Sequence, residues 1–187
     1  YHVDAAGVLT VKTRLVIQRG ADGKPLPLLP KIGYQVVLEG TYAAVRWLGR
    51  GPFENYWDRK QAADISLHTV PVENVATPYI RPQENGTRCD VRWVECVRDP
   101  QAGCGRVRVV SCDAPLMISA WPYTQSDLAQ ARHACEVPRR ELLTLNLDHR
   151  QMGVGGDNSW GLPVHDEYTI PAEGTYAWEM QLQYEAP

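Results

Sequence analysis

One loop of this chain combines residue types that bind sugars. Residues 152–161 read Met-Gly-Val-Gly-Gly-Asp-Asn-Ser-Trp-Gly and present one tryptophan, Trp160. Glycine permits positive φ and close packing, so such a loop can hold an irregular shape. An aromatic face beside the short polar side chains of Asp157, Asn158 and Ser159 is typical of a sugar-binding edge. Composition alone leaves an alternative, in which the glycines form a turn between strands and Trp160 fills a core.

Two further segments join glycine turns to aromatic and charged residues. In the first, Glu54, Asp58 and Arg59 are expected to form a pairing network that locks the loop. In the second, prolines favour an extended run and Asn85-Gly86 predicts a hairpin-type turn. A structural role is expected for both segments, which cover residues 47–59 and 77–88.

Histidine and cysteine give no signature of a metal site. His133 and His165 stand alone, and single histidines are more often structural than catalytic. Because no His, Cys or carboxylate cluster has ligand spacing, no structural metal is expected. The five cysteines are odd in number and lack C-x-x-C spacing, which favours free, buried thiols in a reducing, cytoplasmic compartment. A bridge between Cys96 and Cys104 across a hairpin stays open, since sequence does not supply its geometry.

The composition is that of one folded domain spanning residues 1–187. The chain is 44% hydrophobic and 22% charged, and it is long enough for one well-buried core. A net charge of -3 without a cationic cluster argues against nucleic acid as a partner. No apolar run approaches the roughly 20 residues of a membrane span, and Tyr1-His2-Val3-Asp4 lacks the layout of a signal peptide, so no membrane partner is expected.

Most of the chain predicts short strands separated by turns. One helix is expected over residues 124–136, with Thr124 as its N-cap and Leu128, Ala131 and Cys135 on one face. A second short helix is expected over residues 55–62. The class is therefore all-β and antiparallel, with one or two short helices. The expected strands cover residues 8–13, 15–17, 34–38, 42–48, 87–97, 107–111, 116–120, 142–148 and 176–184.

Four motifs in register carry a family resemblance. Residues 29–33 (Leu-Pro-Lys-Ile-Gly), the two segments above and the 152–161 loop resemble the C-terminal small-chain domain, domain 5, of glycoside hydrolase family 2 β-galactosidases. The resemblance covers nearly the whole chain and implies an antiparallel β-supersandwich of the galactose mutarotase type. It also implies that Trp160 reaches the mouth of the active site as a sugar platform, with Asp157 and Asn158 as substrate-binding neighbours. Lys31 and Trp57 depart from the pattern, which usually has arginine and often proline at these positions.

The same resemblance implies no catalytic residue on this chain. Retaining glycoside hydrolysis needs two carboxyl groups about 5 Å apart, one protonated and one ionised. The family carries both on a separate (β/α)₈ barrel, together with Mg²⁺ and Na⁺, so no cofactor is expected here. Turn or ion-pair roles suit the acids of the motif loops, which are Glu54, Glu84, Asp157 and Glu167.

The implied partners are the rest of a β-galactosidase chain, or its large subunit, and a galactoside such as lactose. Assembly into a homo-oligomer stays open. Two other functions also stay open: a stand-alone aldose epimerase of the mutarotase type, which needs a paired acid and base, and a purely structural assembly module. Enhanced anomerisation of galactose would identify the first. Burial of Trp160 in a core would favour the second.

Overall fold

Alternating apolar and polar residues build the longest strand of this chain. The computed structural model describes residues 1–20, 23–158 and 160–186. In β11 (Gly174–Glu185), the side chains of Tyr176, Trp178 and Met180 are buried, as the period of two in a half-buried strand requires. β11 pairs antiparallel with β2 (Leu9–Ile17) and with β8 (Arg106–Ser111).

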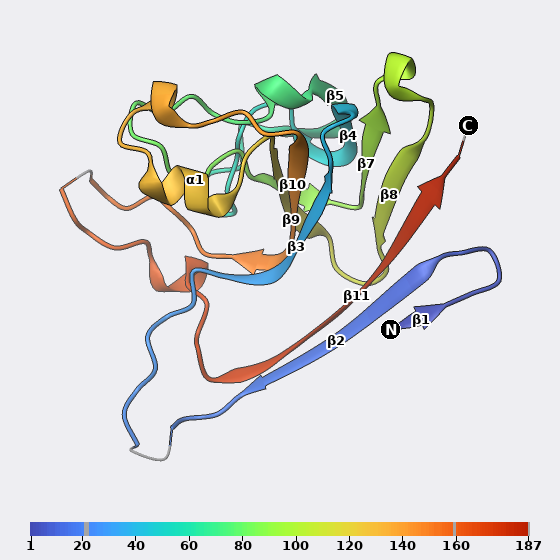
Figure 1. Ribbon diagram of the computed structural model, residues 1–187. Coiled ribbons are helices and arrows are strands. Elements are labelled where there is room, and N and C mark those ends of the chain that lie inside the picture. Colours follow the sequence, from blue (N-terminus) through green and yellow to red (C-terminus); the bar gives the residue numbers. More distant parts are fainter. Residues whose placement is uncertain (21–22, 159, 187) are drawn as a thin grey trace.

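The strands form two antiparallel sheets (Figure 1). The larger sheet has the order β1-β2-β11-β8-β7-β4-β5 and the smaller has the order β3-β10-β9-β6. β2 and β11 run side by side as a long ribbon at one side of the molecule. The other strands are β1 (His2–Val3), β3 (Lys31–Glu39), β4 (Tyr42–Gly51), β5 (Asp64–Pro71), β6 (Arg88–Val91), β7 (Trp93–Arg98), β9 (Leu116–Trp121) and β10 (Leu142–Gln151).

The inner faces of the two sheets meet in a shared hydrophobic core. Trp47 and Val94 of the larger sheet lie in one cluster with Leu145 and Leu147 of the smaller sheet, and each is at most 1% exposed. Burying a leucine of this kind stabilises the fold by about 1.5–3 kcal/mol relative to leaving it in water. The antiparallel all-β sandwich expected from the sequence is therefore confirmed.

The outer face of the smaller sheet is also covered, which explains why every residue of β9 is buried. The covering layer contains the helix α1 (Gln125–Gln130) and the loop around Asn85. The indole of Trp121 donates a hydrogen bond to the Asn85 carbonyl oxygen, and the Thr144 hydroxyl donates to the Tyr123 carbonyl oxygen. The described part of the chain also contains the 3₁₀ turns η1 (Val72–Asn74), η2 (Pro100–Ala102), η3 (Ala134–Glu136) and η4 (Asp166–Tyr168).

The helix after Thr124 begins where predicted and ends earlier. Thr124 and Asp127 form a reciprocal capping box at its start. The helix stops because Ala131 is extended, with ψ of 136°, and η3 follows as a separate turn. The predicted extent to residue 136 is thus wrong, and Cys135 is exposed.

The expected helix over residues 55–62 is wrong. This segment consists of turns, with an isolated bridge between Tyr56 and Arg59. The Arg50 guanidinium donates to the carbonyl oxygens of Lys60 and Ala63, at 3.0 and 2.8 Å. These side-chain contacts fix the backbone in a non-helical path.

Several strand predictions also need correction. The predicted strands at 8–13 and 15–17 are one strand, β2. The predicted strand at 87–97 divides into β6 and β7 at Arg92, close to Asp90, whose φ is 56°. β1 and β5 were not expected, and β5 is an edge strand that leaves Ile65 and Leu67 46% and 55% exposed. Asn85-Gly86 forms no hairpin, because β6 pairs with β9.

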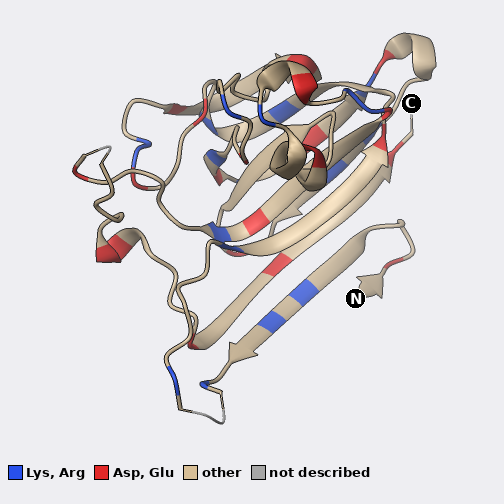
Figure 2. Ribbon diagram, turned by 60° about the vertical axis from the view of Figure 1, so that its left-hand side comes forward, with Lys and Arg blue, Asp and Glu red and all other residues tan. Residues whose placement is uncertain are grey.

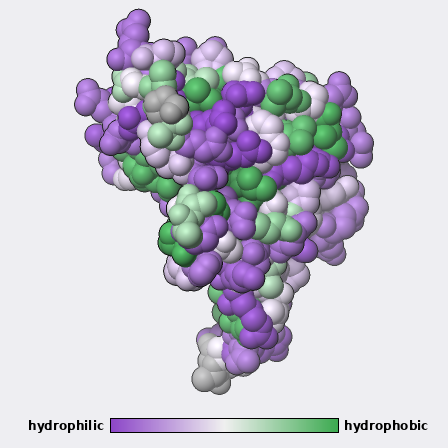
Figure 3. Space-filling view, turned by 90° about the vertical axis from the view of Figure 1, so that its right-hand side faces the viewer, coloured by the Kyte–Doolittle hydropathy of each residue, from purple (hydrophilic) through white to green (hydrophobic). Residues whose placement is uncertain are grey.

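The cysteines are free thiols, and the charged residues of the two sheets are mixed in sign (Figure 2). All five cysteines are free, so Cys96 and Cys104 form no bridge, and only Cys89 and Cys96 are buried as expected. Acidic and basic residues are interspersed over both sheets (Figure 2). On the face drawn in Figure 3, apolar side chains lie in small groups among hydrophilic ones. None of the helices in the described part of the chain is long and apolar enough to cross a membrane.

Candidate functional site

The glycine loop that follows β10 is tied to the sandwich through its backbone amides. Met152 donates to the carbonyl oxygen of Pro30 at 2.9 Å, and Gly153 donates to that of Tyr168 at 2.8 Å. These bonds fix the start of the loop between the segment before β3 and the η4 turn. The start of the loop is thus an ordered extension of the sheet.

The carboxylate of Asp58 holds the next two residues of the loop. Its Oδ2 atom accepts the amide of Val154 at 3.1 Å and the amide of Gly155 at 2.7 Å. The predicted network of Glu54, Asp58 and Arg59 therefore forms only in part. Arg59 pairs with Glu54 at 2.7 Å, whereas Asp58 turns away to the glycine loop.

Close packing explains three of the glycines. A Cβ on Gly153 would lie 2.6 Å from Cγ2 of Val164, and one on Gly156 would lie 2.4 Å from the Leu162 carbonyl oxygen. A Cβ on Gly155 would lie 3.0 Å from the Asp58 carboxylate. Gly161, by contrast, has a φ of 128°, which L side chains rarely adopt.

The loop presents Trp160 to solvent. This side chain is 91% exposed, in contrast to the buried Trp47 and Trp121 of the core. The Trp160 amide donates to the Asn158 Oδ1 atom at 2.8 Å, a local turn of the kind that asparagine favours. Ser159 lies outside the described residues.

Asp157 forms an ion pair with His165 across the end of the loop. Its Oδ1 atom lies 2.7 Å from the Nε2 atom of His165. This hydrogen bond raises the pKa of the imidazole above its usual value. The structure thus places the three predicted substrate-binding residues, Trp160, Asp157 and Asn158, on one loop, and it gives the two polar residues contacts that shape that loop.

An aromatic pair supports the opposite side of the loop. The indole of Trp57 donates to the Tyr168 carbonyl oxygen at 3.0 Å, and the two rings meet edge to face at 5.9 Å. Trp57, which departs from the family pattern, therefore connects the η4 turn to the loop between β4 and β5, residues 52–63. No local pattern in the sequence pointed to Tyr168, because its partner Trp57 is 111 residues away in the chain.

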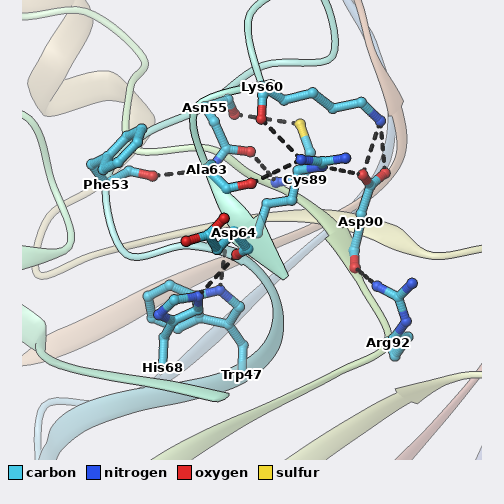
Figure 4. A network of polar contacts seen from close by, with 11 residues as sticks. Trp47, Phe53, Asn55, Lys60, Ala63, Asp64, His68, Cys89, Asp90 and Arg92 are labelled. Carbon is cyan, nitrogen blue, oxygen red and sulfur yellow. Dashed lines mark hydrogen bonds and ion pairs between the residues drawn. The ribbon is translucent and has the colours of Figure 1, made fainter. Parts of the chain in front are cut away.

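A polar network fixes the 52–63 loop itself (Figure 4). The carboxylate of Asp90 accepts hydrogen bonds from Arg50 at 2.6 Å and from Lys60 at 2.9 Å. On the other side, the Asn55 Oδ1 atom accepts the amide of Cys89 at 2.9 Å. These bonds join the loop to β4 and β6, so the Asp58 anchor has a fixed position.

Glu54 and Glu84, two acids of the motif loops, have structural partners. Glu54 accepts the Gly86 amide at 2.7 Å and the hydroxyl of Tyr79 at 2.6 Å, in addition to the Arg59 pair. Burial alone would raise the pKa of Glu54, but these hydrogen bonds bring it below its usual value. Glu84 pairs with Lys31 at 2.6 Å.

A groove of about 650 Å³ lies beside the glycine loop. Its lining includes Gly155, Asn158 and Leu162 of the loop region, together with Pro30, Tyr56 and Glu84 from other parts of the chain. Within the described residues, no group of three or more His, Cys, Asp or Glu side chains is arranged to hold a metal ion. The site therefore offers a groove, an exposed aromatic ring and short polar groups, which suit binding of a hydroxylated ligand.

Comparison with known proteins gives a consistent result. The family model described as beta galactosidase small chain matches residues 1–182. A beta-galactosidase of Priestia megaterium is 36% identical over 83% of this chain, and one of Psychromonas ingrahamii is 41% identical over 86%. Beta-galactosidase BgaC of Bifidobacterium adolescentis is 35% identical over 98% of the chain.

These relatives are much longer than the chain. The matched region covers 15%, 14% and 17% of their respective lengths. The match nevertheless spans nearly the whole of the present sequence, including the glycine loop and the segments that anchor it. The chain belongs to the β-galactosidase small-chain family.

Proposed function

We propose that this chain is the small-chain part of a β-galactosidase and that it presents Trp160 to the sugar. The exposure of Trp160 on an anchored loop is the observation that carries this proposal. A large ring left in water gains little for folding, whereas its face can stack on the C–H groups of a galactoside. A purely structural module would instead bury this ring.

The chain is proposed to contribute no catalytic carboxylate. Among the acids of the motif loops, Glu54, Glu84 and Asp157 each have a cationic or histidine partner. A retaining glycosidase needs one carboxyl kept protonated and another free to attack, about 5 Å apart. We therefore assign galactoside cleavage to a larger partner. The much greater length of the relatives supports the existence of such a partner. Turnover of a nitrophenyl β-galactoside by the rigorously purified chain would contradict this assignment.

The test of the platform role is Trp160→Ala in the assembled β-galactosidase. An aromatic contact contributes about 0.5–1.5 kcal/mol, so KM for lactose should rise about 2- to 12-fold. Trp160→Phe keeps a ring and should restore most of the affinity. The control is Leu67→Ala, which removes a 55% exposed apolar side chain from β5. Unchanged KM and unchanged transfer to sugar acceptors in Trp160→Ala would contradict the platform role.

A further inference from the structure

A row of polar side chains lies on the outer face of the smaller sheet. The register pairs Asn146 of β10 with Gln35 of β3 and with Ser119 of β9. The Gln35 amide donates to the Asn146 Oδ1 atom at 3.0 Å, and the Asn146 amide donates to the Ser119 hydroxyl at 2.9 Å. Because side chains alternate along a strand, this row faces away from the apolar core that holds Leu145 and Leu147.

Asp148 continues this row and points into a cavity. The residue is 2% exposed, and none of the described residues donates a hydrogen bond to its carboxyl group. It lies opposite Gly33, where a Cβ would be only 2.4 Å from the Asp148 Oδ1 atom. Glycine at this position leaves room for the carboxyl, so the packing of the sheet accommodates the buried acid.

The cavity in front of Asp148 has a volume of about 520 Å³. Its lining comes from four parts of the chain, which are held together by hydrogen bonds. Lys31 lies 2.6 Å from Glu84, and the Gln125 amide of α1 donates to the other oxygen of Glu84 at 3.1 Å. The side chains of Asn146 and Gln35, from neighbouring strands, also line the cavity.

The charges in this cavity favour a neutral ligand. Lys31 is balanced by its ion pair with Glu84, so an anion would find no uncompensated cation there, and burial favours the neutral form of the Asp148 carboxyl. The amides of Gln35 and Gln125 supply donors, and Asp148 supplies an acceptor that receives no hydrogen bond from the described residues. This mixture of donors and acceptors matches the vicinal hydroxyl groups of a sugar.

We propose that this cavity is a second saccharide-binding site, which binds a neutral sugar unit through Asp148, Asn146 and Gln35. Burial raises the pKa of Asp148 to about 7, so its carboxyl can donate as well as accept near neutral pH. The cavity shares Pro30, Glu84 and Gln151 with the groove beside the glycine loop. The two sites adjoin, but the Trp160 ring lines neither the floor nor the walls of the second one.

The test is a titration of the ¹⁵N-labelled full chain with D-galactose, D-glucose and lactose, followed by NMR. At least one of these sugars should shift the amides of Gly33, Gln35, Asn146 and Asp148 with a millimolar Kd, which is typical of a single sugar unit. Loss of one hydrogen bond should weaken this binding about fivefold in Gln35→Ala and in Asp148→Ala. Trp160→Ala should leave this Kd within about twofold.

Matched controls separate this site from the loop and from folding defects. Asp113→Asn changes an exposed aspartate outside the cavity and should bind as the unmodified chain does. If Asp148→Ala does not fold, Gln35→Ala decides, because Gln35 is an exposed residue on an edge strand. Shifts confined to residues 152–162, or none with all three sugars, would overturn the second site. The first of these results would leave the role of Trp160 intact.

Discussion

The Asp58 carboxylate accepts the amide hydrogen of Gly155 at 2.7 Å, although the two residues are 97 positions apart. The same oxygen atom accepts the amide of Val154 at 3.1 Å. One side chain from an earlier motif therefore determines where the glycine loop lies. This relationship also connects the polar network around Asp90 to the exposed Trp160.

Removal of this carboxylate should loosen the loop. We expect Asp58→Ala to lower the free energy of unfolding by about 1–2 kcal/mol, because two amides lose their acceptor. Asp58→Asn keeps an oxygen acceptor and should lose less. Urea denaturation measures the stability, and hydrogen exchange at Val154 and Gly155 reports the local effect. Equal exchange rates in Asp58→Ala and the unmodified chain would argue against the anchor.

Two glycines of the loop should differ in their tolerance of a methyl group. In Gly156→Ala the new Cβ meets a backbone carbonyl oxygen at 2.4 Å, whereas in Gly155→Ala it meets a carboxylate oxygen at 3.0 Å. The first variant should lose about 2 kcal/mol of stability and the second clearly less. Thermal unfolding of both variants measures the difference. A larger loss in Gly155→Ala would contradict the packing described for Gly156.

Stability should depend on pH through Asp148. Its pKa rises from 3.8 in the unfolded reference to about 7 in the folded chain, because burial disfavours the charged form. The contribution is therefore fully present below about pH 4 and is lost as pH rises through 7, by about 4 kcal/mol at most. In Asp148→Asn this loss should vanish. Urea unfolding of both proteins between pH 5 and 8 measures the difference in stability. The pH dependence from all other groups is common to the two proteins and cancels in that difference. Parallel curves would contradict the raised pKa.

The ion pair of Asp157 and His165 should be visible in a titration. The hydrogen bond from Asp157 raises the pKa of His165, so the imidazole should titrate above about 6.5. Its stabilising contribution is present at low pH and is lost as pH rises through the folded pKa. Asp157→Asn should bring the pKa back toward 6.5. NMR of the imidazole carbons measures the His165 pKa in Asp157→Asn and in the unmodified chain.

Thiol labelling should separate the cysteines into two classes. Cys104, Cys112 and Cys135 are exposed and should react with a thiol reagent in the native chain. Cys89 and Cys96 should react only after unfolding, because burial raises the pKa of each thiol to about 12. Mass spectrometry of the labelled peptides identifies the sites. Fast labelling of Cys96 would contradict its place in the core.

The sequence predicted the strands whose residues alternate or run apolar, as in β10 and β11, because burial of one or both faces controls their composition. It missed β5, since an exposed edge strand needs no such pattern. The helix predicted over residues 55–62 was wrong, because the path of that backbone depends on its tertiary contacts with Arg50. Local patterns cannot contain such contacts.

The candidate site shows the same division. Trp160 and its glycines are visible in the sequence because they are neighbours in the chain. The bond between Asp58 and Gly155 and the position of Asp148 opposite Gly33 depend on sheet register. Neither residue pair could be predicted before the strands were placed against one another.

The anchoring of the glycine loop sets a condition for transplanting it. Residues 152–168 moved alone to another β-sandwich would carry the tryptophan and the glycines but neither Asp58 nor Trp57. The smallest portable unit is a pair of segments, 52–63 together with 152–168, mounted on two strands with the spacing of β4 and β10. A graft that omits the first segment would have the same loop sequence in a different conformation.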